Sequence, residues 1–220
     1  MALVDTLDEQ ALLERVLDDS KPSVPPECRH LHYLLFTPFR YGALYPAGSR
    51  FRRPGLTAGV FYASQQSETA VGELAFRRLL FFAESPATPW PVNAAEYTAF
   101  AVAYSGRKGL DLTRPPFDRH AAKWMDPVDY DACHDLADAA REAGVQVLRY
   151  QSARAEGLNI ALLNCGAFAS PAPLERHVWR VHLSPTGVRA ICAFPERRLE
   201  FDRQAFARDP RIAKLDWERP

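Results

Sequence analysis

The feature that most constrains this chain is a strand–loop–helix unit spanning residues 59–86. Its first part, GVFYAS, is rich in β-branched and aromatic residues and predicts a short strand. Ser67 is placed to cap a helix through ETAVGELAFRRLLFFAES, and Pro86 ends it because proline cannot continue a helix. The strongest pattern in the sequence therefore places Glu73 within a helix that closely follows a strand.

The other segments predict a mixture of helices and strands. Thr6 is expected to cap an N-terminal helix, and a second helix over 129–143 is closed by Gly144. Short apolar or alternating runs predict strands at 30–36, 96–104, 145–150, 159–168, 178–184, 188–194 and 197–201. Because strands are not regularly followed by helices, the fold class predicted is α+β, with the later strands returning antiparallel.

The length of 220 residues favours one domain over 1–220. Residues 1–25 are expected to form a peripheral N-terminal helix, and residues 205–220 a C-terminal surface tail. Since 27 Lys and Arg balance 27 Asp and Glu, net charge implies no direct nucleic-acid or membrane partner. With neither a signal-like start nor a long apolar run in the sequence, the expected location is the cytoplasm.

The four cysteines, Cys28, Cys133, Cys165 and Cys192, are far apart in the sequence and form no CxxC pair. This spacing argues against a disulfide framework and favours buried structural thiols. The histidines show no ligand spacing, so no metal site is expected.

Glu73 shares its predicted helix face with apolar side chains and with one cation, Arg77. A partly desolvated carboxylate requires a partner. The simplest interpretation is a structural Glu73–Arg77 pair between residues four apart on the helix.

The segment upstream of this helix favours a ligand site instead. It is rich in Pro and Gly, and its arginines and tyrosines include Arg40, Tyr41, Arg50, Arg52, Arg53 and Tyr62. Arginine binds phosphate oxygens bidentately and a tyrosine ring stacks on flat heterocycles, so a dinucleotide matches both. Any of Arg50, Arg52 and Arg53 can instead be a solvated charge. Of the three, Arg50 is favoured as the phosphate-binding arginine by its position in GSRF.

The motifs PFRY, GSRF, GVFYASxxxxTAxxE, YQSAR and NIAL together resemble the RES domain over roughly residues 36–165. The resemblance implies an ADP-ribosyltransferase-like mixed or antiparallel β core flanked by helices. It also implies NAD⁺ as the substrate, with cleavage of the nicotinamide–ribose bond and no metal. The PFRY form and the N-terminal helix are similar to ParT-like members, which act as transferases.

By this resemblance Glu73, Arg50 and Tyr62 are the candidate catalytic residues. The candidate NAD⁺-binding residues are Arg40, Tyr41, Arg50, Tyr62 and Ser152. Glu73 would stabilise the charge on the ribose, Arg40 or Arg50 would hold the pyrophosphate, and Ser152 would hydrogen-bond the ribose or nicotinamide.

The function implied is the toxin of a type II toxin–antitoxin pair that transfers ADP-ribose to a cellular protein. Its expected partner is a cognate antitoxin with a helix-turn-helix domain. Two alternatives stay open: an NAD⁺ glycohydrolase or phosphorylase that depletes NAD⁺, and a non-catalytic nucleotide-binding module.

Overall fold

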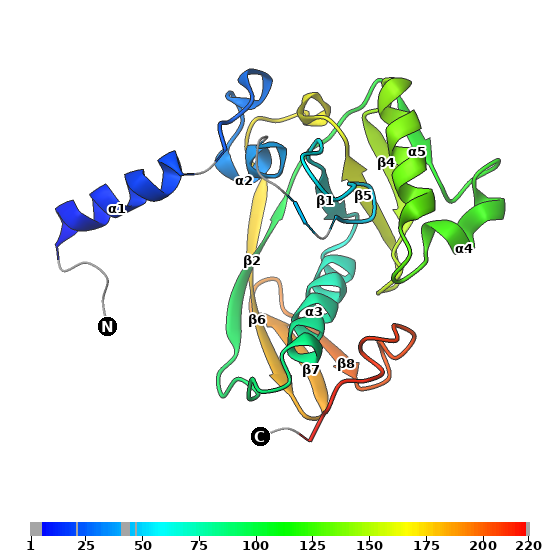
Figure 1. Cartoon of the computed structure of the whole chain (residues 1–220). Helices are drawn as coiled ribbons and strands as arrows, with labels where there is room; N and C mark the ends of the chain where they lie inside the picture. Colours follow the sequence, from blue (N-terminus) through cyan, green and yellow to red (C-terminus); the bar gives the residue numbers. More distant parts are fainter. Residues whose placement is uncertain (1–5, 21, 41–44, 47, 219–220) are drawn as a thin grey trace.

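Two four-stranded sheets form the framework of the computed structural model, which describes residues 6–20, 22–40, 45–46 and 48–218. The first sheet has the order β1 (Phe61–Ser64), β5 (Leu158–Leu162), β4 (Val147–Gln151) and β3 (Gly109–Asp111). The second has the order β2 (Ala95–Ala101), β6 (Glu175–Ser184), β7 (Gly187–Cys192) and β8 (Arg197–Asp202). The second sheet is antiparallel throughout, and the first is mixed because β3 runs parallel to β4. This confirms the α+β class (Figure 1).

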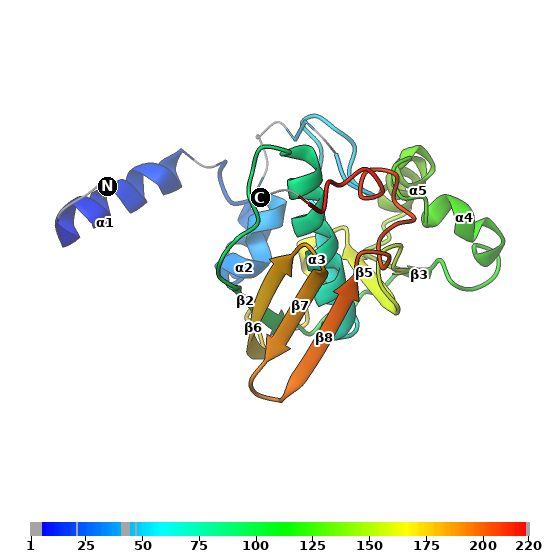
Figure 2. The same cartoon turned by 90° about the horizontal axis from the view of Figure 1, so that it is seen from below.

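Helix α3 (Ser67–Glu84) follows β1 and packs on the second sheet (Figure 2). Its buried residues Ala75, Leu79 and Phe82 share a core with Trp179 and Val181 of β6. Helix α3 thereby links the two sheets, since its chain leaves the first sheet and its apolar face covers the second. Glu73 is the seventh of the 18 residues of α3.

The first sheet is covered by helix α5 (Asp131–Glu142), whose buried Cys133, Ala137 and Ala140 pack with Leu148 of β4. Gly144 has a φ of 71°, the left-handed conformation expected of a residue that follows a helix. The short helical segments are η1 (Pro26–Cys28), α2 (Tyr33–Phe36), η2 (Thr37–Phe39), η3 (Asp118–His120), α4 (Ala121–Trp124) and η4 (Cys165–Ala167).

The strand predicted at 30–36 is wrong, because residues 33–36 form helix α2. His32 caps it, its ring Nδ1 accepting a hydrogen bond from the backbone N–H of Leu34. Leu31 and Leu35 are buried four residues apart, which is the helical period rather than the alternation of a strand.

The two helix caps predicted from the sequence differ in outcome. Thr6 Oγ1 accepts from the N–H of Glu9, while the Glu9 carboxylate accepts from the N–H of Thr6, which is a reciprocal capping box. At α3, by contrast, the capping position is Gln66, which makes no side-chain cap, and Ser67 is the first helical residue.

Helix α1 (Leu7–Asp19) extends away from the rest of the chain (Figure 1). Leu7, Leu12 and Val16 are exposed on it, so its apolar positions contribute little to the cores of the two sheets.

The C-terminal segment differs from the surface tail that the sequence suggested. Phe206, Asp209, Ile212 and Leu215 are all buried, and the three apolar ones join the core between α3 and the second sheet. They recur every three residues through consecutive turns, a spacing that the sequence reading did not associate with burial.

All four cysteines are buried and unpaired by disulfides, which confirms their structural interpretation. No helix within the described part of the chain combines the length and apolar character needed to cross a membrane.

Candidate active site

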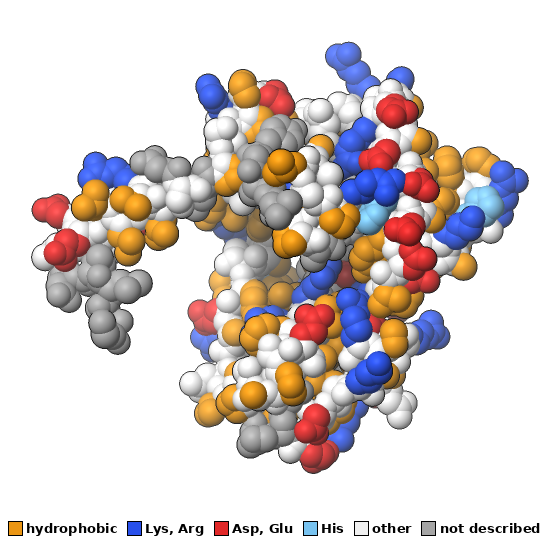
Figure 3. All heavy atoms as spheres, in the orientation of Figure 1, with side chains coloured by type: hydrophobic (Ala, Val, Ile, Leu, Met, Phe, Trp, Pro, Cys, Tyr) orange, Lys and Arg blue, Asp and Glu red, His pale blue; other side chains and the backbone are white. Residues whose placement is uncertain are grey.

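A cavity of about 330 Å³ lies between the first turns of α3, strands β1 and β5, and the start of α5. The side chains around it are Ser49, Arg50, Tyr62, Ala63, Ser64, Ala70, Glu73, Leu74, Phe76, Arg77, Tyr130, Tyr150, Arg154 and Asn159. In the space-filling view, basic side chains lie around the hollow between the two halves of the molecule (Figure 3). Three arginines and one carboxylate thus face the same space.

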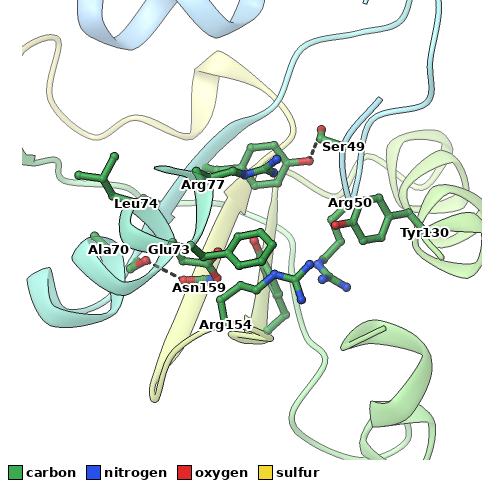
Figure 4. A pocket seen from close by; sticks show the side chains of 14 residues that line it. Ser49, Arg50, Ala70, Glu73, Leu74, Arg77, Tyr130, Arg154 and Asn159 are labelled. Atoms are coloured by element: carbon green, nitrogen blue, oxygen red, sulfur yellow. Dashed lines mark hydrogen bonds between the residues drawn. The ribbon is translucent and has the colours of Figure 1, made fainter. Parts of the chain in front are cut away.

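Glu73 is the carboxylate of this cavity (Figure 4), and two neutral donors hold one of its oxygens. Its Oε1 accepts from Ser152 Oγ at 2.7 Å and from Asn159 Nδ2 at 2.7 Å. Within the described residues, no hydrogen bond reaches its Oε2. Glu73 is therefore oriented through one oxygen and keeps the other available.

Two glycines let α3 approach the 152–157 loop closely enough for these bonds. A Cβ at Gly72 would lie 2.6 Å from the Cβ of Ala155, well inside contact distance. Gly157 has a φ of 106° and faces Thr69, whose hydroxyl donates to the carbonyl of Glu156. The helix and the loop are thus fixed together beside Glu73.

Ser152 is buried, and all the hydrogen-bonding capacity of its hydroxyl is in use. It donates to Glu73 and accepts from the backbone N–H groups of Arg154 at 3.2 Å and Ala155 at 3.0 Å. Ser152 is also absent from the cavity lining. It is brought together with Glu73 as expected, but as a support for the carboxylate.

Asn159 supports Glu73 from strand β5 and is itself oriented by Ser64. Ser64 Oγ donates to Asn159 Oδ1 at 2.7 Å, which leaves the amide nitrogen facing Glu73. Because Ser64 and Asn159 are paired across β1 and β5, the sheet register fixes this chain of hydrogen bonds.

Arg50 lies across the cavity from Glu73 and is held at two points. Its Nη1 donates to the carbonyl of Trp124 at 2.5 Å, and its guanidinium lies over the ring of Tyr130 at 4.8 Å. This arginine is therefore ordered by contacts within the chain, with its charge beside the cavity.

Arg154 and Arg77 differ strongly in their surroundings. Arg154 stacks over Phe76 at 4.1 Å and pairs with Asp209 at 3.1 Å, and burial lowers its pKa from the ordinary value. Arg77 is exposed, and within the described residues it forms no ion pair with Glu73. The predicted Glu73–Arg77 pair is therefore wrong, because Ser152 and Asn159 hold the carboxylate instead.

Tyr62 lines the cavity, but its hydroxyl is engaged with the loop that carries Arg50. It accepts from the N–H of Phe51 at 2.9 Å and is 2.9 Å from Ser49 Oγ. Burial raises the pKa of this hydroxyl above its ordinary value. Tyr62 thus connects β1 to the arginine-bearing loop.

The remaining predicted residues do not join this group. Arg40 donates to the carbonyl of Pro22 and stacks over Phe36, away from the cavity lining, while Tyr41 lies outside the described residues. Arg52 stacks over Tyr45, and Arg53 pairs with acidic residues of α5. Only Arg50 of the three clustered arginines lines the cavity, as its position in GSRF favoured.

A comparison with known protein families identifies a RES domain over residues 24–184. The chain belongs to the RES-domain family. RES domains are associated with toxin–antitoxin pairs, with a partner antitoxin, and with enzymes that use NAD⁺. A comparison with curated proteins finds no match. In this RES domain, the carboxylate, the serine and one of the arginines singled out from the sequence meet at one place.

Asn159, Arg154 and Tyr130 are among the cavity residues that the sequence analysis did not single out. Asn159 and Arg154 belong to the NIAL and YQSAR motifs. The motifs were therefore recognised in the sequence, but no function was predicted for these two residues. Tyr130 lies just before α5 and carries no motif. Only the folded chain places its ring against Arg50.

Proposed function

We propose that this RES domain binds NAD⁺ in the Glu73 cavity, cleaves its nicotinamide–ribose bond and transfers the ADP-ribose to a cellular protein. The single observation that carries the proposal is the carboxylate of Glu73, held through Oε1 by two neutral donors while Oε2 stays available. In this reading the chain is the toxin of a type II toxin–antitoxin pair.

The chemistry follows from the charge that develops when the bond breaks. Nicotinamide leaves with the bonding electrons of C1′, so the ribose acquires oxocarbenium character. A preorganised carboxylate stabilises that positive charge or holds a ribose hydroxyl, and it needs no reorganisation because Ser152 and Asn159 already fix it. The acceptor then donates a lone pair to C1′ and loses a proton.

The arginines are suited to the pyrophosphate of the same substrate. Arg50 is ordered at the cavity and Arg77 presents a guanidinium without a partner in the described chain, so together they offer two cations to phosphate oxygens. Tyr62 and Tyr130 add aromatic surface for the nicotinamide and ribose. The proposed residue set is thus Glu73 and Arg50, with Arg77, Tyr62 and Tyr130 around the dinucleotide.

The proposed partner is a cognate antitoxin with a helix-turn-helix domain, whose tail blocks this cation-rich cavity. An acidic or C-terminal carboxylate group in such a tail would compete with the pyrophosphate for the same arginines. Binding of the antitoxin should therefore slow NAD⁺ turnover competitively.

The first prediction concerns Glu73 and the fate of the label. Incubation with NAD⁺ labelled in the adenylate half is expected to leave label on a protein band. Glu73→Gln should lower turnover at least about 100-fold, since a lost charge-stabilising group commonly costs a factor of about 10²–10³. Glu84→Gln, an exposed glutamate at the far end of α3, is the matched control and should retain wild-type turnover.

Each outcome has a distinct meaning. Free ADP-ribose or ADP-ribose phosphate as the main labelled product would replace protein transfer with hydrolysis or phosphorolysis. Unchanged turnover in Glu73→Gln would contradict the catalytic role of Glu73, and binding of NAD⁺ without any turnover would indicate a nucleotide-binding module.

A further inference from the structure

The buried pair Arg154–Asp209 joins the cavity to a segment beyond the matched RES domain. Arg154 lies within residues 24–184, whereas Asp209 belongs to the C-terminal turns that follow β8. Their side chains are 6% and 1% exposed, and their charged groups are 3.1 Å apart. Arg154, one of the three arginines that line the cavity, is thus paired with a residue from outside the family match.

Asp209 holds more than one group in place. It also pairs with Arg211 at 2.8 Å, and both Arg154 and Arg211 donate to the backbone carbonyl of Pro127. Pro127 precedes α5 in the same loop as Tyr130, whose hydroxyl also reaches the Pro127 carbonyl. Asp209 therefore connects the C-terminal segment to the loop on which Arg50 stacks.

Arg154 is also close enough to the Glu73 side of the cavity to form an ion pair with Glu73 if Asp209 is removed. Its guanidinium stacks on Phe76, which is one turn beyond Glu73 on α3, and the charge of Glu73 acts on it. A desolvated guanidinium needs a carboxylate, and among the described residues Glu73 is the one carboxylate that lines this cavity. Asp209 satisfies that need and leaves Glu73 Oε2 available.

We propose that Asp209 is a positioning residue that holds Arg154 toward the cavity and keeps it from pairing with Glu73. The inference rests on the proposed function, because Glu73 is taken there as the group that reacts. Arg154 itself, held in this way, serves substrate binding as a third cation for the phosphates. The C-terminal segment is thus part of the working site.

The test separates kcat from KM for NAD⁺ turnover. Asp209→Asn should lower kcat at least tenfold with KM changed less than threefold, because Arg154 then pairs with Glu73. Arg154→Gln should raise KM at least fivefold and lower kcat less than threefold. The double variant should behave like Arg154→Gln alone, since the cation that captures Glu73 is gone. Asp202→Asn is the control, an exposed aspartate that caps the turn leading into the same segment.

The double variant also guards against a folding defect in Asp209→Asn. It removes the buried cation with its carboxylate, and the remaining Arg211 is 35% exposed and so can be solvated. A double variant at least tenfold lower in kcat than Arg154→Gln would overturn the proposal, because Asp209 would then act without Arg154. Wild-type kcat in Asp209→Asn would overturn it equally.

A crystal structure of Asp209→Asn provides a readout that does not depend on NAD⁺ chemistry. We expect an Arg154 nitrogen within 4 Å of a Glu73 oxygen, and an Arg154 that remains in its original place would overturn the proposal. If wild-type protein does not consume NAD⁺ while this rearrangement occurs, the proposed function fails and the positioning of Arg154 stands.

Discussion

At the scale of single residues, Glu73 is placed by hydrogen bonds rather than by an ion pair. Neutral donors from Ser152 and Asn159 fix its direction without cancelling its charge. A pair with Arg77 would have held the carboxylate equally well but reduced the field it exerts on a nearby positive centre. The arrangement suits a carboxylate that acts through its negative charge on a nearby positive centre.

Ser152→Ala tests the support of Glu73. Loss of one of its two donors should lower kcat by roughly tenfold, which corresponds to about 1.4 kcal/mol. Two backbone N–H groups also lose their acceptor, so the free energy of unfolding should fall by about 1–3 kcal/mol. Steady-state kinetics and urea unfolding measure the two effects.

The control for this variant is Ser170→Ala, which removes a half-buried hydroxyl that makes similar local backbone hydrogen bonds but does not line the cavity. Wild-type kcat in Ser152→Ala would contradict the positioning of Glu73 through this hydroxyl.

At this scale the sequence predicted Glu73, Arg50 and Ser152 as neighbours, and the structure brings them to one region. It did not predict the direction of hydrogen bonds, because that depends on contacts between distant segments. Ser152 accepts from its own loop as well as donating to Glu73, so its hydroxyl is not free for a ligand. Arg40 does not line the cavity, because its guanidinium donates to the carbonyl of Pro22 and stacks over the ring of Phe36.

At the scale of elements, helix α3 and the 152–157 loop form one unit around Glu73. Gly72 sits at their contact, where any side chain would meet Ala155. The unit explains why a glycine stands in the middle of a helix, although glycine there costs up to about 1 kcal/mol in helix propensity.

Gly72→Ala should therefore destabilise the protein despite the better helix propensity of alanine. We expect the free energy of unfolding to fall by about 1–3 kcal/mol, as for other overpacked sites, and kcat to fall because α3 is displaced from Ser152. Gly109→Ala is the matched control, since its Cβ would make only ordinary contacts of 3.6 Å and longer. A stabilised Gly72→Ala protein with wild-type kcat would show that the helix and loop are not tightly coupled.

Local patterns predicted α3, α5 and most strands because their periodicity agreed with their packing. The segment at 30–36 failed because a short apolar run fits a strand and a helical turn equally well. This segment forms a helical turn because Leu31 and Leu35 are buried on one side and His32 caps the helix. The missing cap at Ser67 similarly reflects its contacts with Glu68 and Arg197.

At the scale of the whole molecule, the cavity lies between the first sheet and α3, and the C-terminal segment is linked to it through the Arg154–Asp209 pair. The order of strands in the two sheets depends on pairings between distant segments, which a reading of local periodicity does not contain. The C-terminal turns were misjudged for the same reason. Their apolar residues, such as Ile212 and Leu215, are isolated in a polar sequence and are buried only because the second sheet and α3 provide a partner surface.

The Arg154–Asp209–Arg211 cluster makes the stability of the whole molecule depend on acid. Burial opposes ionisation of Asp209, but hydrogen bonds from Arg211 and the charge of Arg154 lower its pKa below the ordinary value overall. A carboxyl whose pKa is lower in the folded state stabilises the protein above its unfolded pKa of about 3.9 and loses this effect as the pH falls below it.

We therefore expect the difference in unfolding free energy between wild type and Asp209→Asn to be largest at neutral pH and to shrink below about pH 4. Urea unfolding at pH 7, 4 and 3 measures this. Asp111, whose pKa is also lowered, remains in both proteins, so part of the acid sensitivity should persist in the variant. A difference that stays constant with pH would contradict the ionised role of Asp209.

The way Arg50 is held has a consequence for affinity. Ordering a long side chain on binding usually costs about 0.5–1.5 kcal/mol, and here the ring of Tyr130 and the carbonyl of Trp124 have already ordered it. A phosphate that binds in the cavity meets an arginine that is already ordered. Most of the side-chain entropy is therefore lost when the protein folds and not when the ligand binds. The same contacts occupy one nitrogen and one face of the guanidinium, so a ligand can approach only the remaining nitrogens and the other face, which makes the direction of approach selective.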